Sequence, residues 1–178
     1  MERTFRLQRI IAVCFLVMCI VLFVLSLGFM TDFKDLFGLQ LKPNKPVAYL
    51  HDVLLQGYNR SLFHLAVCAL LVAVVSIVLE TNRKVPDLSA LLVMDTLLVV
   101  LVIWSVMQVL SLAGIEPVYL ATDYSKVRLE GGFDYVLNTR TFAISYVVEI
   151  LFALHCLAFG TLLTLAHVRF LKEEAGGK

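Results

Sequence analysis

Four long apolar runs, separated by polar stretches, set the pattern of the chain. The runs cover residues 10–30, 62–79, 88–112 and 142–168. A helix of about 20 apolar residues is long enough to cross the ~30 Å hydrocarbon core of a bilayer. The pattern therefore predicts an all-α integral membrane protein, a single domain built as a bundle of four transmembrane helices.

The polar stretches predict how these helices are joined. Residues 31–61 and 113–141 are two connections of about thirty residues, residues 80–87 are a short turn and residues 169–178 are a tail. In the second connection two glycines separate two alternating runs, which is typical of a tight β-hairpin because its turn needs positive φ. We expect that hairpin over residues 126–137.

The first connection also contains helical patterning. Apolar residues recur at helical spacing over 47–58, which favours an amphipathic helix lying on the membrane surface. Ser61 is then a candidate N-cap for the second membrane helix. Asn59-Arg60-Ser61 also matches the sequon for N-glycosylation, a tripeptide that is common by chance.

Basic residues favour one orientation of the bundle. Four helices place both termini on the same side of the membrane, and the short segments on that side carry these basic residues: Arg3, Arg6, Arg9, Arg83, Lys84, Arg169 and Lys172. By the positive-inside rule the termini are cytoplasmic and the two long connections are extracytoplasmic. The expected location is a plasma membrane or a bacterial inner membrane.

Small residues at helical spacing mark the faces where helices are expected to pack. In the first helix Ala12, Cys19 and Ser26 belong to one such seam, together with Phe15 and Leu22. Small side chains let helix backbones approach closely where no hydrophobic effect drives association. The candidate packing residues of the other helices are Ala66, Ala69, Ala73, Ala153, Cys156 and Gly160.

Four ionisable residues within the apolar runs are the candidate chemistry: Glu149, Asp95, His155 and His64. A charged side chain at the centre of a membrane helix costs at least ~2.5 kcal/mol, so such residues suggest a proton relay or a contact with another subunit. The other interpretation is structural, a protonated or hydrogen-bonded acid that holds helices of the bundle together. At 1.5 Å per residue, Glu149 lies roughly 10 Å below the outer surface and Asp95 roughly 10 Å above the inner one. The two acids are therefore not expected to form a pair.

The last apolar run carries polar residues on two faces. At 100° per residue, Glu149, Cys156, Gly160 and His167 fall within about 20° of one line, and His155 lies about 120° away. We expect a packed seam that contains Glu149, and a separate His155 that faces Asp95 at the same depth. For Glu149 the expected partners are His64, Ser145 or Tyr146.

Composition and motifs exclude several classes of function. The chain has 178 residues, of which 60% are hydrophobic and 16% charged. With a net charge of +1 it has no basic surface suited to nucleic acid. The four cysteines lie in apolar runs without a metal-binding or redox spacing, and we interpret them as packing residues. His64 and His155 differ by roughly 16 Å in depth, too far for one haem iron.

Two hypotheses of function remain. Phosphate-binding, hydrolase and redox motifs are lacking, so no catalytic, cofactor-binding or metal-binding residue is assigned and no cofactor is expected. The first hypothesis is a non-enzymatic accessory or assembly subunit that binds other membrane proteins, or copies of itself, through small-residue helix faces and outer connections. The alternative is a small proton-coupled transporter or ion-conducting subunit that uses Glu149, Asp95 and His155.

Overall fold

Helices make up nearly all of the described chain. The computed structural model describes residues 2–37, 45–82, 88–125, 137 and 139–176, and this part contains no strand. The elements in chain order are α1 (Glu2–Phe37), α2 (Lys45–Tyr49), the π-helix η1 (Leu50–Leu55), α3 (Gln56–Asn82), α4 (Leu88–Ala121) and α5 (Arg140–Gly176). The expected hairpin over 126–137 lies outside the described residues, apart from Leu137.

Four helical segments are long and apolar enough to cross a membrane, as expected. They are Arg9–Leu27, Lys45–Val78, Leu88–Ala121 and Arg140–Lys172. The all-helical character is thereby confirmed for the described residues, and the four candidate spans suggest a multi-pass membrane protein.

The helices are longer than the apolar runs from which we predicted them. Residues 45–61, assigned above to a connection, continue without interruption into α3. Val47, Leu50 and Leu55 are buried there, so this stretch packs as part of the bundle and not as a separate surface helix. Its polar residues contact one another, because His51 lies 2.6 Å from Asp52 and 3.3 Å from Gln56. The start of the second long helix, as predicted from polar composition alone, was therefore wrong.

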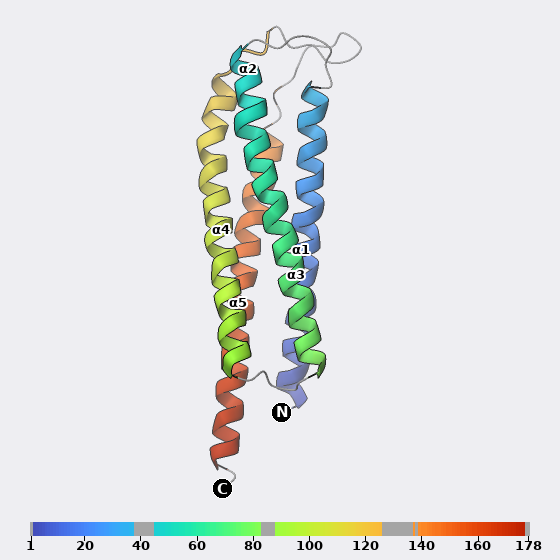
Figure 1. Cartoon of the computed structure of the whole chain (residues 1–178), viewed down its shortest axis with the longest axis vertical. Helices are drawn as coiled ribbons and strands as arrows, with labels where there is room; N and C mark the ends of the chain where they lie inside the picture. Colours follow the sequence, from blue (N-terminus) through green and yellow to red (C-terminus); the bar gives the residue numbers. More distant parts are fainter. Residues whose placement is uncertain (1, 38–44, 83–87, 126–136, 138, 177–178) are drawn as a thin grey trace.

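The four long helices form a closed ring (Figure 1). Both α1 and α4 pack against α3 and against α5, so each helix touches the helices before and after it in the chain, and the last helix touches the first. Both termini lie at the same end of the bundle, and the C-terminal part of α5 extends beyond the other helices. The ring encloses one central core, and each of the four helices also has a face on the outside of the bundle.

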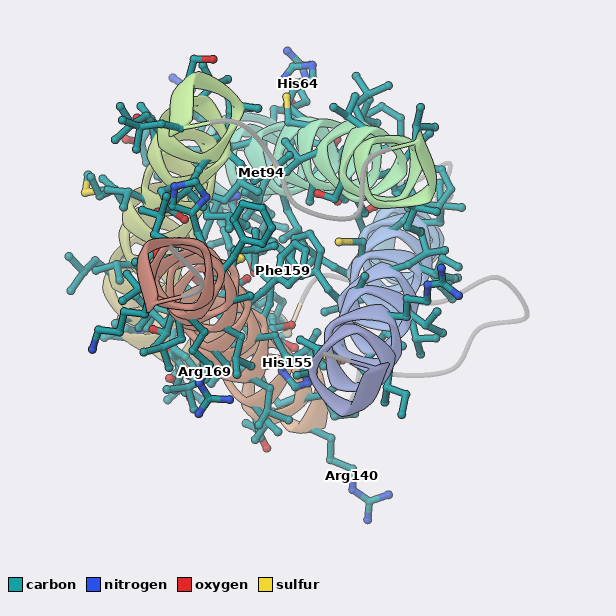
Figure 2. The ribbon with its side chains drawn as sticks, turned by 90° about the horizontal axis from the view of Figure 1, so that it is seen from below. His64, Met94, Arg140, His155, Phe159 and Arg169 are labelled. Atoms are coloured by element: carbon teal, nitrogen blue, oxygen red, sulfur yellow. The ribbon has the colours of Figure 1, made fainter. Side chains whose placement is uncertain are left out.

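The core is apolar and the outer faces are apolar too. The predicted seam of α1 is buried along its whole length: Ala12, Phe15, Cys19, Leu22 and Ser26. Phe159 lies at the centre of the bundle (Figure 2), and its ring stacks on Phe15 with 5.1 Å between centroids. Exposed valines and leucines cover the outside of all four long helices, which suits a hydrocarbon environment and not water.

Candidate functional site

Glu149 is fully buried inside the bundle. The hydroxyl of Tyr58 on α3 donates a hydrogen bond to Glu149 Oε1. Glu149 Oε2 is also buried and accepts no hydrogen bond from any residue that the structure describes. The contact joins α3 and α5 through two residues that are 91 positions apart in sequence. The acid predicted to be on the packed seam of the last helix is on that seam, and its partner is a tyrosine.

Two further hydrogen bonds connect this pair to α4. Ser105 Oγ donates to the backbone carbonyl oxygen of Glu149 at 2.9 Å. Gln108 Nε2 donates to the backbone carbonyl oxygen of Tyr58 at 3.5 Å, the long end of hydrogen-bonding range. All four side chains are buried. The cluster of Tyr58, Ser105, Gln108 and Glu149, called here the Glu149 cluster, therefore links α3, α4 and α5.

The partners expected for Glu149 are engaged elsewhere. Ser145 Oγ donates to the carbonyl oxygen of Thr141 at 2.8 Å, and the Tyr146 hydroxyl donates to Glu116 Oε2 at 2.9 Å. His64 is exposed on the outer side of α3 (Figure 2). Tyr58 was missed because it lies in a stretch that was interpreted as a connection. The sequence did contain a signal for Tyr58, because it is three residues after Leu55 and four before Leu62, a spacing typical of one face of a helix.

Asp95 lies at the other end of the membrane segment, at the contact between α4 and α5. Its Oδ2 accepts a hydrogen bond from the Thr164 hydroxyl at 2.9 Å. Its Oδ1 is buried, makes no hydrogen bond within the described chain and faces Gly160, where an added Cβ would lie 3.4 Å away. Asp95 is half-buried and therefore reaches the outer surface of the bundle.

An apolar groove follows Asp95 along the outer surface. It has a volume of about 390 Å³ and is formed by α4 and α5 alone. Its lining residues are Asp95, Leu98, Val99, Val102, Cys156, Leu157, Gly160, Thr161, Thr164 and Leu165. Glycine at position 160 lets Asp95 and Leu98 of α4 lie close to α5, because an added Cβ would be 3.4 Å from each of them. We call this feature the α4–α5 groove.

The expected contact between His155 and Asp95 is not formed. His155 lies on the side of α5 next to α1 (Figure 2), and its Nδ1 donates to the carbonyl oxygen of Leu151 at 2.7 Å. Asp95 instead meets Gly160 and Thr164. The depth expected for His155 was also wrong, because Thr164, which bonds to Asp95, is nine residues or about 13 Å along α5 from His155. Depth in addition says nothing about which side of α5 faces α4.

Aromatic packing separates the two carboxyl groups. Gly160, beside Asp95, is eleven residues from Glu149 on α5, which corresponds to about 16 Å along the helix. Between these levels the interior is filled by Phe152 and Phe159, both of which stack on Phe15 from α1. Phe15, Phe152 and Phe159 are at most 1% exposed. Glu149, Asp95 and His155 thus occupy three different environments.

Most of the predicted small packing residues are buried. Ala66, Ala69, Ala73 and Cys156 are in the core, and Ala153 and Gly160 are half-buried. His167, on the same seam of α5, is buried as well. Most of the residues that helical spacing assigned to packing faces are therefore buried between helices.

The tripeptide that matches the glycosylation sequon lies inside α3. Asn59 is completely buried, and neither of its amide atoms makes a hydrogen bond within the described part of the chain. Ser61 is within the helix and not at its N-cap, and its Oγ accepts a hydrogen bond from Trp104 Nε1 on α4 at 3.0 Å. A buried asparagine in a helix is not a glycosylation site in the folded protein.

In residues 2–37, 45–82, 88–125, 137 and 139–176, no group of three histidine, cysteine or acidic side chains converges as metal ligands would. Comparison with protein-family models, with curated proteins and with solved structures gives no match. The function is therefore argued from the Glu149 cluster and the α4–α5 groove.

Proposed function

We propose that this chain is a non-enzymatic accessory or assembly subunit that binds another membrane protein through the outer face formed by α4 and α5. The α4–α5 groove carries this proposal. It places a carboxyl group on a face that otherwise presents mainly apolar side chains, together with Thr161 and Thr164. A carboxyl group facing hydrocarbon is costly, and a partner that covers it removes that cost.

The Glu149 cluster supports a structural role for the rest of the bundle. Its hydrogen bonds join three helices and are buried from the outer surface. Polar contacts of this kind stabilise membrane helix bundles by about 0.6 kcal/mol each on average. In this account they hold α3, α4 and α5 together, about 16 Å along α5 from the level of Asp95.

The same geometry argues against the alternative of proton-coupled transport or ion conduction. Such a path requires polar side chains or water between Glu149 and Asp95, and Phe15, Phe152 and Phe159 fill that space. His155, the third member of the suggested path, bonds to its own helix. No continuous relay connects these three residues among the described side chains.

The proposed subunit lies in a plasma membrane or a bacterial inner membrane, with both termini in the cytoplasm. The basic residues near the shared end of the bundle, including Arg9, Arg169 and Lys172, support this orientation. Asp95, which follows the start of α4 by seven residues, then lies about 10 Å from the cytoplasmic edge of the hydrocarbon.

Photo-crosslinking in native membranes tests the proposed function. A photoreactive amino acid at Thr161, in the groove, is expected to give a discrete adduct with a membrane protein, and the same group at Val74, exposed on α3, is not. Gly160→Leu, which fills the groove, should abolish the adduct. Equal labelling from both positions, or lipid adducts alone from Thr161, would contradict the proposal.

A further inference from the structure

The chemistry of the α4–α5 groove indicates what kind of partner it accepts. Resting on the proposed function, we propose that the groove receives one transmembrane helix of a different protein, and that this helix places a lysine or arginine side chain next to Asp95. The juxtaposition behind the proposal is a carboxyl group that lines a lipid-facing apolar groove and has a buried Oδ1 and an Oδ2 that accepts one hydrogen bond, from Thr164, within the described chain.

Asp95 has more capacity to accept hydrogen bonds than its own bundle uses. An ionised carboxylate has about four lone-pair sites, and Asp95 accepts a single hydrogen bond, from Thr164, within the described chain. The four apolar runs contain no lysine and no arginine, so the bundle supplies no cation within the membrane. Intramembrane acids are usually paired with a basic group or a hydrogen-bond donor. In this proposal the partner helix supplies the cation.

The shape of the groove fits a helix. Along α4 the groove runs from Asp95 to Val102, and seven residues correspond to about 10 Å, or two helical turns. Gly160, Thr161 and Thr164 line it on the α5 side. Small residues of this kind let the backbone of a neighbouring helix approach closely. The depth of Asp95 below the membrane edge, about 10 Å, also places it beneath the lipid headgroups.

A second copy of this chain does not supply the required cation. Copies in one membrane share their orientation, so equivalent residues lie at equal depth. Asp95 is next to Met94, which contacts Ser76 of α3, and His64 is twelve residues from Ser76, or about 18 Å along the helix. His155 is nine residues, about 13 Å, from Thr164. His167 is nearer in depth but is buried in its own bundle. Arg169 is five residues, about 7 Å, beyond Thr164 towards the cytoplasmic end. It lies outside the apolar run, so its guanidinium extends to the headgroups and not to the depth of Asp95. Charge complementarity therefore favours a different protein.

A titration with synthetic transmembrane peptides tests this inference. The full chain is reconstituted in phosphatidylcholine nanodiscs and titrated with tryptophan-free Leu/Ala peptides of about 21 residues. The peptides differ at one position, seven residues from one end, which carries Lys, Leu or Glu. Binding is followed by energy transfer from Trp104, the only tryptophan of the chain, to an acceptor on the peptide.

We expect the Lys peptide to bind at least about tenfold more tightly than the Leu peptide, and the Glu peptide to bind most weakly. Asp95→Asn keeps an acceptor for Thr164 but removes the charge, so it should eliminate the preference for Lys. Glu116→Gln is the matched control, because it removes a carboxyl group from the other end of the same helix, and it should leave the preference unchanged. Gly160→Leu should weaken the binding of both the Lys peptide and the Leu peptide.

Equal binding of the Lys and Leu peptides, or a Lys preference that survives Asp95→Asn, would overturn the inference. If the Thr161 crosslink to a membrane protein is nevertheless obtained, the proposed function stands and only the chemistry of the partner is wrong. An adduct of twice 20.0 kDa, the mass of one chain, would identify a second copy as the occupant and overturn the inference. Lipid adducts alone, with no peptide binding, would overturn both proposals.

Discussion

Glu149 and Asp95 are both acids within membrane-spanning helices, and the bundle surrounds them in different ways. Glu149 is enclosed by α3, α4 and α5 and is bonded to Tyr58. Asp95 stands at the edge of the α4–α5 groove, with Thr164 as its one hydrogen-bond donor in the described chain. The presence of an acid within a membrane helix therefore does not by itself indicate the role of that acid. The elements around it decide whether it joins helices of its own chain or remains available to another.

The aromatic packing between the two acids should have the largest effect on stability. Phe159→Ala removes a ring that is 1% exposed and stacked on Phe15. We expect a loss of about 3–5 kcal/mol in the free energy of unfolding, because the cavity left behind collapses only partly. Unfolding in mixed detergent micelles, followed by circular dichroism, measures this loss. Leu154→Ala, an exposed position on the same helix, is the control and should change the free energy by less than about 0.5 kcal/mol.

Replacing Glu149 should have the next largest effect. Glu149→Ala leaves the buried hydroxyl of Tyr58 without its acceptor and creates a space in the core. We expect a loss of about 2–3 kcal/mol in the free energy of unfolding. Glu149→Gln retains a carbonyl acceptor on a side chain of the same length, so its free energy of unfolding should fall much less. A Glu149→Ala protein as stable as the wild type would refute the helix-joining role of the cluster.

The contribution of Tyr58 should be smaller and coupled to that of Glu149. Tyr58→Phe removes only the hydroxyl group and should cost about 1 kcal/mol. In the double variant with Glu149→Ala the two losses should not add, because each single change already removes the same hydrogen bond. A double-mutant cycle on the free energies of unfolding measures the coupling. Simple additivity would mean that the two side chains act independently.

Asp95 should contribute least to stability, although it is also an intramembrane acid. Asp95→Asn keeps an oxygen that accepts the Thr164 hydrogen bond, and the residue already reaches the outer surface. We expect a change of less than about 0.5 kcal/mol in the free energy of unfolding of the isolated chain. The same unfolding measurement checks it. A loss comparable to that of Glu149→Ala would remove the distinction between the two acids.

Much of this fold could be predicted from the sequence. The four apolar runs predicted four helices able to span a membrane, because each is long enough to do so. Small-residue spacing predicted the buried seams of α1 and α3, because a period near 3.6 residues places such residues on one face. The seam of α5 was also found, and both Glu149 and Gly160 belong to it.

The partners of the two acids could not be predicted, for two physical reasons. Tyr58 lies in a stretch whose polar residues satisfy one another, so composition suggested a connection where the helix continues. Helical spacing fixes the angles between residues of one helix but not the rotation of that helix against its neighbours. His155 was therefore assigned to Asp95, although it faces α1. Asp95 instead meets Gly160 and Thr164.

The most direct test compares how a bound helix stabilises variants at the two acids. The free energy of unfolding is measured for the wild type, Glu149→Ala and Asp95→Asn, each with and without the Lys peptide at about one hundred times its dissociation constant for the wild type. Binding to the folded state alone adds about 2.7 kcal/mol under these conditions. The account predicts this gain for the wild type and for Glu149→Ala, which is less stable at the outset, and a much smaller gain for Asp95→Asn. A gain that is lost in Glu149→Ala and retained in Asp95→Asn would contradict it.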